Sequence, residues 1–403
     1  MAQKFFQLIP PGTNFEFVKR MKLWFGLSIT LVGLSIGMMV VNHYRKGEVL
    51  NFGIDFKGGT EMLVDFKKPV EAGAVRNALK GVVKDVEVIA YSGSDVKYGF
   101  SVRTPETTTV AEAERLKQAD AIAKKFEDRE IYLVKWRGDT LQIRAGKEIK
   151  RDELFAAING LGSGIRAKPA EKIEIKQKLS EYVIDAPVFG LDVKVRDALE
   201  KSLGADVIND IPRVETVGAK AGEELRNDGI KSLVYAIILI MLYIAFRFDF
   251  RFGPPTVVAL LHDSILVIGA YAVLWLEVNL TTVAALLTVI GFSMNDTVVV
   301  FDRIREDAAR YKDRKFDRVV NTAVNETLSR TILTSATVFF VTLAMNIFGT
   351  GVIRNFAFAM NVGIIVGTYS SVFIAAPILI WLTQRYSERP LPARSARPAR
   401  TEA

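Results

Sequence analysis

Two aspartates lie inside long apolar segments of this 403-residue chain, where their charge is unusual. Asp263 follows His262 in the segment 254–275, and Asp296 lies in the segment 280–301. A carboxylate inside the hydrocarbon of a membrane costs about 2.5 to 3.5 kcal/mol unless it is neutralised or paired. Residues of this kind commonly face other helices and take part in ion or proton movement. The sequence therefore predicts a buried ionisable cluster.

The two carboxylates are expected at similar depths in the membrane, because a helix rises about 1.5 Å per residue. Counted from Pro254, Asp263 is about 14 Å deep, and counted from Arg303, Asp296 is about 10 Å deep. Arg330 opens the next apolar segment, and its long side chain can reach back to Asp296. We predict a network of these three charged groups.

Other polar side chains occur near the same depths and can support the network through hydrogen bonds or a short chain of water. They are His262, Ser293, Asn295, Thr297, Thr331 and Ser335. Two interpretations of the cluster stay open. In one, a reversible change of carboxylate protonation makes it a proton relay. In the other, Asp296 and Arg330 form a static ion pair that only fixes helix packing. We favour the relay, because several ionisable groups share one depth.

These residues need a scaffold that crosses the membrane, and the hydropathy of the chain predicts one. The chain is 50% hydrophobic with a mean hydropathy of +0.21, and its charges are separated from its apolar blocks. Six blocks have the length of about 20 residues that a transmembrane helix requires. They are 23–41, 231–248, 254–275, 280–301, 330–348 and 356–382.

Lysines and arginines predict the orientation of these helices. They cluster in 1–22, in 302–329 and in 383–403, whereas the short loops on the opposite side have almost none. Because cytoplasmic loops carry an excess of positive residues, both termini are expected in the cytoplasm and residues 42–229 outside it. We expect 302–329 to form an amphipathic helix on the cytoplasmic membrane surface. The tail 383–403 is expected to be disordered and to rest on anionic lipid.

Residues 42–229 combine strand-like and helix-like patterns. Alternation of apolar and polar residues predicts a strand at 61–66, and apolar spacing predicts a helix at 71–79. The pattern recurs further along, so we expect a ferredoxin-like α+β domain with a second unit inserted at about 104–182. The expected fold is therefore a polytopic α-helical membrane protein with six transmembrane helices and one α+β domain outside the membrane.

The remaining composition excludes several classes of function. Without cysteine the chain has no thiolate metal site, and with two histidines it is not expected to be a metal enzyme. We find no hydrolase or kinase motif, and we expect neither enzymatic activity nor a cofactor. The net charge of +8 comes from residues that flank the spans, which argues against nucleic-acid binding.

Several motifs resemble those of the SecD/SecF family. The segment 52–60, Phe-Gly-Ile-Asp-Phe-Lys-Gly-Gly-Thr, resembles the signature that opens the periplasmic domain of that family. Its signature residues here are Gly53, Asp55, Phe56, Gly58 and Gly59. Four further segments are similar to the SecF members of the family, namely 217–226, 261–263, 286–306 and 327–331.

The resemblance implies an accessory subunit of the bacterial Sec preprotein translocase, located in the inner membrane and built like half of an RND transporter. It implies a heterodimer with SecD that works beside SecYEG on a translocating preprotein, with protons as the coupling ion. By the same resemblance Asp296 and Arg330 conduct protons, SecD supplies the remaining carboxylate, and Asp263 has a supporting role. The stretch 104–182 has no expected counterpart in the family pattern. The alternatives are an RND-type proton-driven exporter of lipids or small molecules and a membrane scaffold without ion coupling.

Overall fold

A computed structural model of the chain describes residues 14–93, 96–108, 112–137, 139–161, 167–178, 181–188 and 190–386. These residues form two compact units. The helical unit comprises the described parts of Met1–Phe52 and Asn227–Ala403, and the α+β unit is Gly53–Arg226. Most of the basic tail expected at 383–403 lies outside the described residues.

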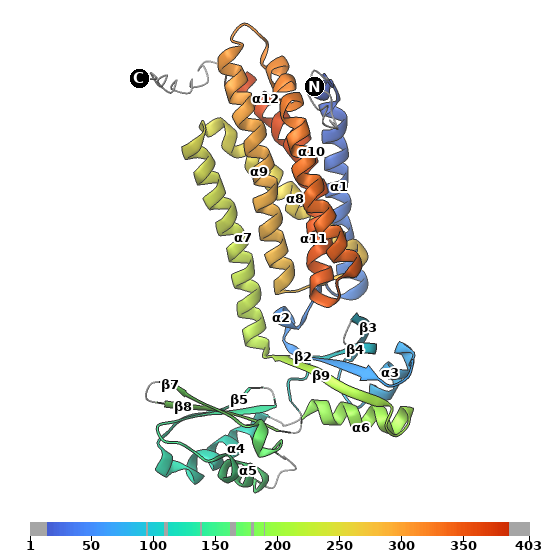
Figure 1. The fold of residues 1–403 in the computed structure, drawn as a ribbon, viewed down its shortest axis with the longest axis vertical. Coiled ribbons are helices and arrows are strands. Elements are labelled where there is room, and N and C mark those ends of the chain that lie inside the picture. Colours follow the sequence, from blue (N-terminus) through green and yellow to red (C-terminus); the bar gives the residue numbers. More distant parts are fainter. Residues whose placement is uncertain are drawn as a thin grey trace, which may run out of the picture. The chain divides into compact units, whose positions relative to one another are not determined.

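Long apolar helices make up the helical unit (Figure 1). Within the described residues six helical segments are long and apolar enough to cross a membrane, which confirms the predicted six-span fold. They are α1 (Phe17–Lys46), α7 (Ala219–Arg247), α8 (Gly253–Leu274), α9 (Leu280–Arg310), α10 (Phe316–Phe348) and α11 (Gly351–Ser370), which continues through the π-helical turn Ser371–Ala375 into α12 (Ala376–Arg385). A short parallel pairing of β1 (Asn51–Phe52) with β10 (Glu277–Val278) joins two of the loops in this unit.

Residues 302–329 do not form a separate surface helix, so that prediction was wrong. Instead, α9 and α10 extend through this region and are joined by the turn 311–315. The apolar residues Ile304, Val320 and Val324 are at most 1% exposed and belong to the core between the helices. The apolar face that indicated a membrane surface therefore packs against neighbouring helices.

Close contact between α9 and α11 depends on two glycines. A Cβ atom at Gly363 would lie 2.2 Å from Cγ2 of Val289, and one at Gly367 would lie 2.9 Å from Cβ of Ser293. Real Cβ atoms do not approach other atoms this closely, so the spacing of small residues four apart lets the two backbones meet. This contact places the polar residues of α9 beside those of α11.

The first sheet of the α+β unit has the strand order β3-β4-β2-β9 and is antiparallel throughout. Its strands are β2 (Gly59–Phe66), β3 (Glu87–Gly93), β4 (Val96–Thr104) and β9 (Ile208–Val217). The helices α3 (Ala72–Leu79) and α6 (Leu191–Leu203) contribute Val75, Leu79, Leu191, Val195 and Leu199 to its core. This βαββαβ order and strand arrangement is ferredoxin-like, as predicted.

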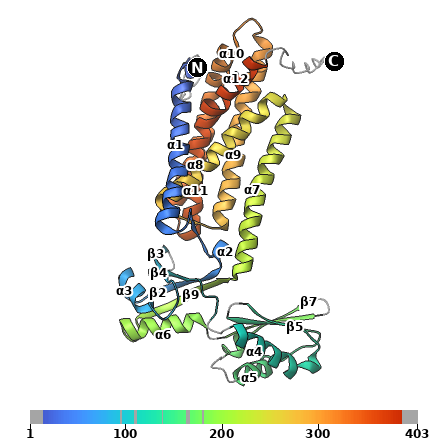
Figure 2. The same ribbon diagram turned by 180° about the vertical axis from the view of Figure 1, so that it is seen from behind.

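A second sheet with its own core interrupts this domain between β4 and α6 (Figure 2). Its strand order is β5-β6-β8-β7, with β5 (Ile131–Arg137), β6 (Thr140–Ala145), β7 (Glu174–Lys178) and β8 (Glu181–Pro187). The helices α4 (Glu112–Lys125) and α5 (Arg151–Asn159) contribute Ile122, Leu154 and Ile158 to that core. The structure therefore places the strands of the second unit between Ile131 and Pro187.

The Gly-Gly signature forms a tight turn at the start of β2, after the helical turn α2 (Ile54–Lys57). Gly58 and Gly59 have φ angles of +76° and +118°, which side chains rarely adopt. A Cβ atom at Gly58 would lie 2.7 Å from Cα of Ala219, and one at Gly59 would lie 2.4 Å from the carbonyl oxygen of Thr104. Both glycines are thus required for packing inside the α+β unit.

The other signature residues surround this turn. Gly53 precedes α2, and Asp55 and Phe56 lie within it, with Phe56 only 4% exposed. The start of α7 approaches the same backbone, because a Cβ atom at Gly222 would lie 2.9 Å from the nitrogen of Gly58. The signature therefore holds the first strand of the domain against the beginning of α7.

Candidate intramembrane proton site

Asp263 lies on α8 and is fully buried, with its carboxylate held by side chains from three helices. The Nδ1 atom of His262 is 2.9 Å from Oδ1. The hydroxyl groups of Ser293 on α9 and Ser370 on α11 donate to Oδ2 at 2.5 and 2.9 Å. Both carboxylate oxygens are therefore satisfied inside the protein.

His262 extends this group of residues toward α1. Its Nε2 atom is 2.9 Å from the hydroxyl oxygen of Tyr369 on α11, and that hydroxyl also contacts the hydroxyl of Ser28. A neutral imidazole fits these contacts when Nδ1–H donates to Asp263 and Nε2 accepts from Tyr369. We call the set Ser28, His262, Asp263, Ser293, Tyr369 and Ser370 the Asp263 cluster. It connects α1, α8, α9 and α11.

Asp296 on α9 is also buried, with 1% of its surface exposed, but it has far fewer partners. Among the described residues only Ser335 on α10 forms a hydrogen bond with it, donating to Oδ2 at 3.3 Å. The hydroxyl of Thr368 on α11 lies 2.8 Å from that of Ser335. The carboxylate of Asp296 therefore has one long hydrogen bond where that of Asp263 has three shorter contacts.

Two neighbouring hydroxyl groups have no hydrogen-bond partner in the described part of the chain. They belong to Thr297 on α9 and Thr331 on α10, whose side chains are 1% and 3% exposed. Buried polar groups are usually satisfied by protein or by ordered water. These two hydroxyls are therefore available to bind ordered water.

Arg330 and Asn295 are placed differently from the prediction, because both side chains are exposed on the helical unit. Among the described residues Arg330 has no ion pair within 4.0 Å, so the predicted direct pair with Asp296 does not form in this structure, although the charge of Arg330 still acts on the Asp296 carboxylate. The single network expected for Asp263, Asp296 and Arg330 is instead two neighbouring groups. They approach each other where Ser293 and Asp296 lie one turn apart on α9.

Sequence reasoning missed the contribution of the last apolar segment. Thr368, Tyr369 and Ser370 occupy successive positions of α11, just before its π-helical turn, and all three join the polar contacts described above. Three consecutive polar residues inside an apolar span are unusual, and this pattern could have predicted that the segment contributes to the polar cluster. No group of three or more metal-binding side chains occurs among the described residues.

The chain is similar to a known family of membrane proteins. Residues 198–385 match the family model for protein export membrane protein SecD/SecF, C-terminal, and residues 49–70 match the SecD/SecF GG motif. Protein translocase subunit SecF of Desulfurispirillum indicum is 42% identical over 374 residues, which cover 92% of this chain and 94% of that protein. The chain belongs to the SecF family.

A second SecF protein, from Calditerrivibrio nitroreducens, is 34% identical over 96% of this chain and 100% of its own length. The two matched family models both lie outside 104–182, so the expectation that this stretch has no counterpart in the family pattern stays a prediction.

A solved structure also resembles the chain. SecDF from Thermus thermophilus, described as a translocon-associated membrane protein, is 27% identical with a TM-score of 0.59. The match covers 94% of this SecF chain but 39% of the SecDF chain. The family match at 198–385 includes Asp263, Asp296 and Arg330, and the motif match at 49–70 includes the Gly-Gly turn.

Proposed function

We propose that this SecF protein works with a SecD partner to couple proton movement to the translocation of preproteins by the Sec machinery. The observation that carries the proposal is the setting of Asp296, which is buried in a membrane span with a single long hydrogen bond. A carboxylate with few fixed partners changes protonation when a neighbouring charge or water molecule moves. Asp296 is therefore the residue to which we assign proton binding.

The exposed surface of α9 and α10 supports the need for a partner. Asn295 and Arg330 are exposed there, and hydrocarbon chains offer no hydrogen-bond acceptor for an amide or a guanidinium group. A second membrane protein with a carboxylate at the same depth would satisfy both and place a charge near Asp296. The name SecDF and the 39% coverage of that solved chain support SecD as this partner.

The contacts around Asp296 give protonation a mechanical consequence. Ser335 donates to the carboxylate and also meets Thr368, so it joins α9, α10 and α11. A protonated carboxyl group is a weaker acceptor, which loosens this junction. The contacts of the Asp263 cluster between α1, α8, α9 and α11 do not depend on the protonation of Asp296. The helix movement that follows protonation is therefore expected mainly in α10 and the helices next to it.

Two further features belong to the proposal. The distribution of basic residues supports cytoplasmic termini and an α+β unit in the periplasm. Membership of the SecF family supports a location in the inner membrane beside SecYEG. α7 is continuous from Ala219 to Arg247 and so links the α+β unit to the helical unit through a helix. A movement in the membrane can therefore reach the domain that meets the preprotein.

The export of lipids or small molecules is less well supported. A cavity of about 520 Å³ in the α+β unit is lined mainly by charged and polar residues, namely Glu148, Lys150, Arg151, Asp152 and Gln177, together with Ile175 and Tyr182. An exporter of apolar compounds needs a pocket with mostly apolar walls. This cavity does not have that character.

The test measures preprotein translocation in membranes that contain SecYEG, SecD and this protein, with and without a proton gradient. The variant Asp296→Asn should lose the stimulation by the gradient and still purify with SecD. Asp313→Asn is the matched control, because it removes an exposed carboxylate from the turn between α9 and α10. Full stimulation in the Asp296→Asn variant at normal expression would exclude the mechanism.

A further inference from the structure

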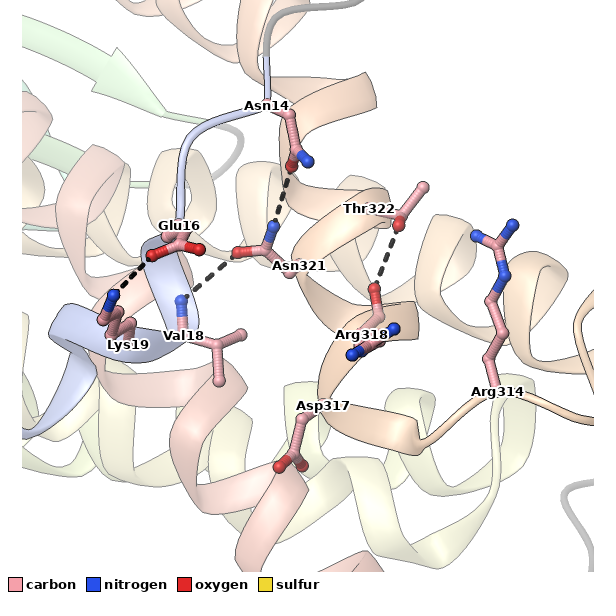
Figure 3. Close-up of a pocket in the computed structure, with 9 residues that line it drawn as sticks. All are labelled: Asn14, Glu16, Val18, Lys19, Arg314, Asp317, Arg318, Asn321 and Thr322. Carbon is pink, nitrogen blue, oxygen red and sulfur yellow. Dashed lines mark hydrogen bonds and ion pairs between the residues drawn. The ribbon is translucent and has the colours of Figure 1, made fainter.

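A polar cavity of about 600 Å³ lies in the helical unit where α1 and α10 begin (Figure 3). One wall is the segment that leads into α1, and the other is the start of α10, as the figure shows. The lining residues are Asn14, Glu16, Val18, Lys19, Arg314, Asp317, Arg318, Asn321 and Thr322.

Hydrogen bonds hold the two walls at a fixed separation. Asn321 Nδ2 donates to Asn14 Oδ1 at 3.1 Å, and the backbone nitrogen of Val18 donates to Asn321 Oδ1 at 3.3 Å. Asn325 adds two bonds to the backbone of Phe15, at 2.8 and 2.9 Å. The cavity is therefore built by specific contacts between α10 and the segment before α1.

Two arginines in the cavity have no counter-ion among the described residues. Arg318 forms no ion pair there, and the only described contact of the Arg314 guanidinium is with the ring of Tyr311, 4.3 Å from its centre. The two lining carboxylates already have partners. Glu16 pairs with Lys19 at 3.0 Å, and the carboxylate of Asp317 accepts a hydrogen bond from the side chain of Gln384 at 2.8 Å.

The start of α10 adds to the positive field in the cavity. The helix has 33 residues, and no side chain caps its first turn, where Lys315 is the N-cap residue. Its first N–H groups therefore lend a partial positive charge to this end. The N–H groups of Arg318 and Val319 already donate to the carbonyl of Lys315, and Asp317 adds a negative charge to this turn. The guanidinium groups of Arg314 and Arg318 are therefore the main donors available for the oxygens of a phosphate group.

We propose that this cavity binds the phosphate headgroup of an anionic membrane lipid. Lys19 precedes Leu23, where the first apolar block begins, by four residues, or about 6 Å along the helix. That distance places the Lys19 side of the cavity in the headgroup layer, which lies just outside the hydrocarbon. Basic side chains at this level attract anionic lipids, and arginine binds phosphate with two parallel hydrogen bonds. The site is independent of the proposed proton coupling.

The experiment is native mass spectrometry of the full chain in detergent, titrated with phosphatidylglycerol. The double variant Arg314→Gln/Arg318→Gln should bind the tightest lipid at least about tenfold more weakly, because two charge-assisted contacts are lost. The control Lys312→Gln/Lys315→Gln removes the same two charges from exposed positions that do not line the cavity. It should change binding by less than about twofold.

Each other result would overturn the proposal. Unchanged binding in the arginine variant would show that the cavity is not the site, and equal losses in both variants would show only diffuse attraction to positive charge. Equal affinity for phosphatidylcholine would show no selection for an anionic headgroup. Displacement of phosphatidylglycerol by millimolar inorganic phosphate would assign the cavity to a soluble phosphate compound instead.

Discussion

Asp263 and Asp296 are buried to the same extent on neighbouring helices, at 0% and 1% exposure, yet their surroundings differ. Asp263 has contacts from His262, Ser293 and Ser370, all at 2.9 Å or less. Asp296 has one hydrogen bond of 3.3 Å, from Ser335. A fully bonded carboxylate stabilises one arrangement of helices, whereas one with few bonds can change its protonation and its partners. Burial alone does not distinguish these roles, but the set of partners does.

The largest expected difference is in stability. Asp263→Ala should lower the free energy of unfolding by about 3 to 5 kcal/mol, because it leaves three buried polar side chains without their acceptor. Asp296→Ala should lower it by no more than about 1 kcal/mol, since only Ser335 loses a partner. Unfolding of the purified protein in detergent, followed by circular dichroism, measures both. Equal losses of unfolding free energy in the two variants would show that the two aspartates do not differ in their contribution to stability.

The contact between α9 and α11 provides the next test. Gly367→Ala introduces a Cβ atom 2.9 Å from Cβ of Ser293, which must shift and weaken its bond to Asp263. Overpacking of this kind costs about 1 to 3 kcal/mol. Gly291→Ala on α9 is the control, because no described atom lies within 4 Å of its added Cβ. If the Gly367→Ala variant keeps the free energy of unfolding of the Gly291→Ala control in the same assay, the prediction is wrong and the two helices can separate slightly without loss of stability.

The outer part of the Asp263 cluster should matter less. Tyr369→Phe removes the hydroxyl that lies 2.9 Å from Nε2 of His262, at a cost of about 1 kcal/mol. Proton-dependent translocation, measured per folded molecule, should stay near the unsubstituted value. A complete loss of proton dependence would instead place Tyr369 on the proton path and remove the distinction between the two groups.

The smallest change in stability is expected at Thr297. Its buried hydroxyl has no described partner, so Thr297→Val should alter the free energy of unfolding by less than about 0.5 kcal/mol. If this hydroxyl binds water near Asp296, the same variant should still slow proton-dependent translocation. Normal translocation in this variant would exclude a role for Thr297 in proton movement. The role of Asp296 is tested independently by the Asp296→Asn variant.

Hydropathy was sufficient to predict the six spans and the burial of both aspartates, because apolar length and the cost of buried charge act locally along the chain. It was insufficient for 302–329, since apolar residues at helical spacing look the same whether they face lipid or another helix. Ile304 and Val324 face helices. The bonds from Tyr369 and Ser370 to His262 and Asp263 join residues 107 positions apart, a separation that no local pattern encodes.

The expected direct contact of Asp296 and Arg330 does not form in this structure, for a different reason. Helical depth was estimated from residue counts, and depth says nothing about which side of a helix faces inward. Asp296 points into the helical unit and Arg330 lies on its surface. Only the packing of α9 against α10 and α11 decides this.

Because α9 and α10 are long, a small tilt of these helices near Asp296 produces a larger displacement at the turn that joins them. The turn 311–315 follows Arg310, which lies 14 residues beyond Asp296 on the same helix, or about 21 Å along its axis. A tilt of about 5° around Asp296 would therefore move the turn by about 2 Å. Arg303 and Glu326 pair across the two helices, so both helices would move together. A rearrangement too small to resolve at the carboxylate would then be readable with a spectroscopic probe attached near the turn.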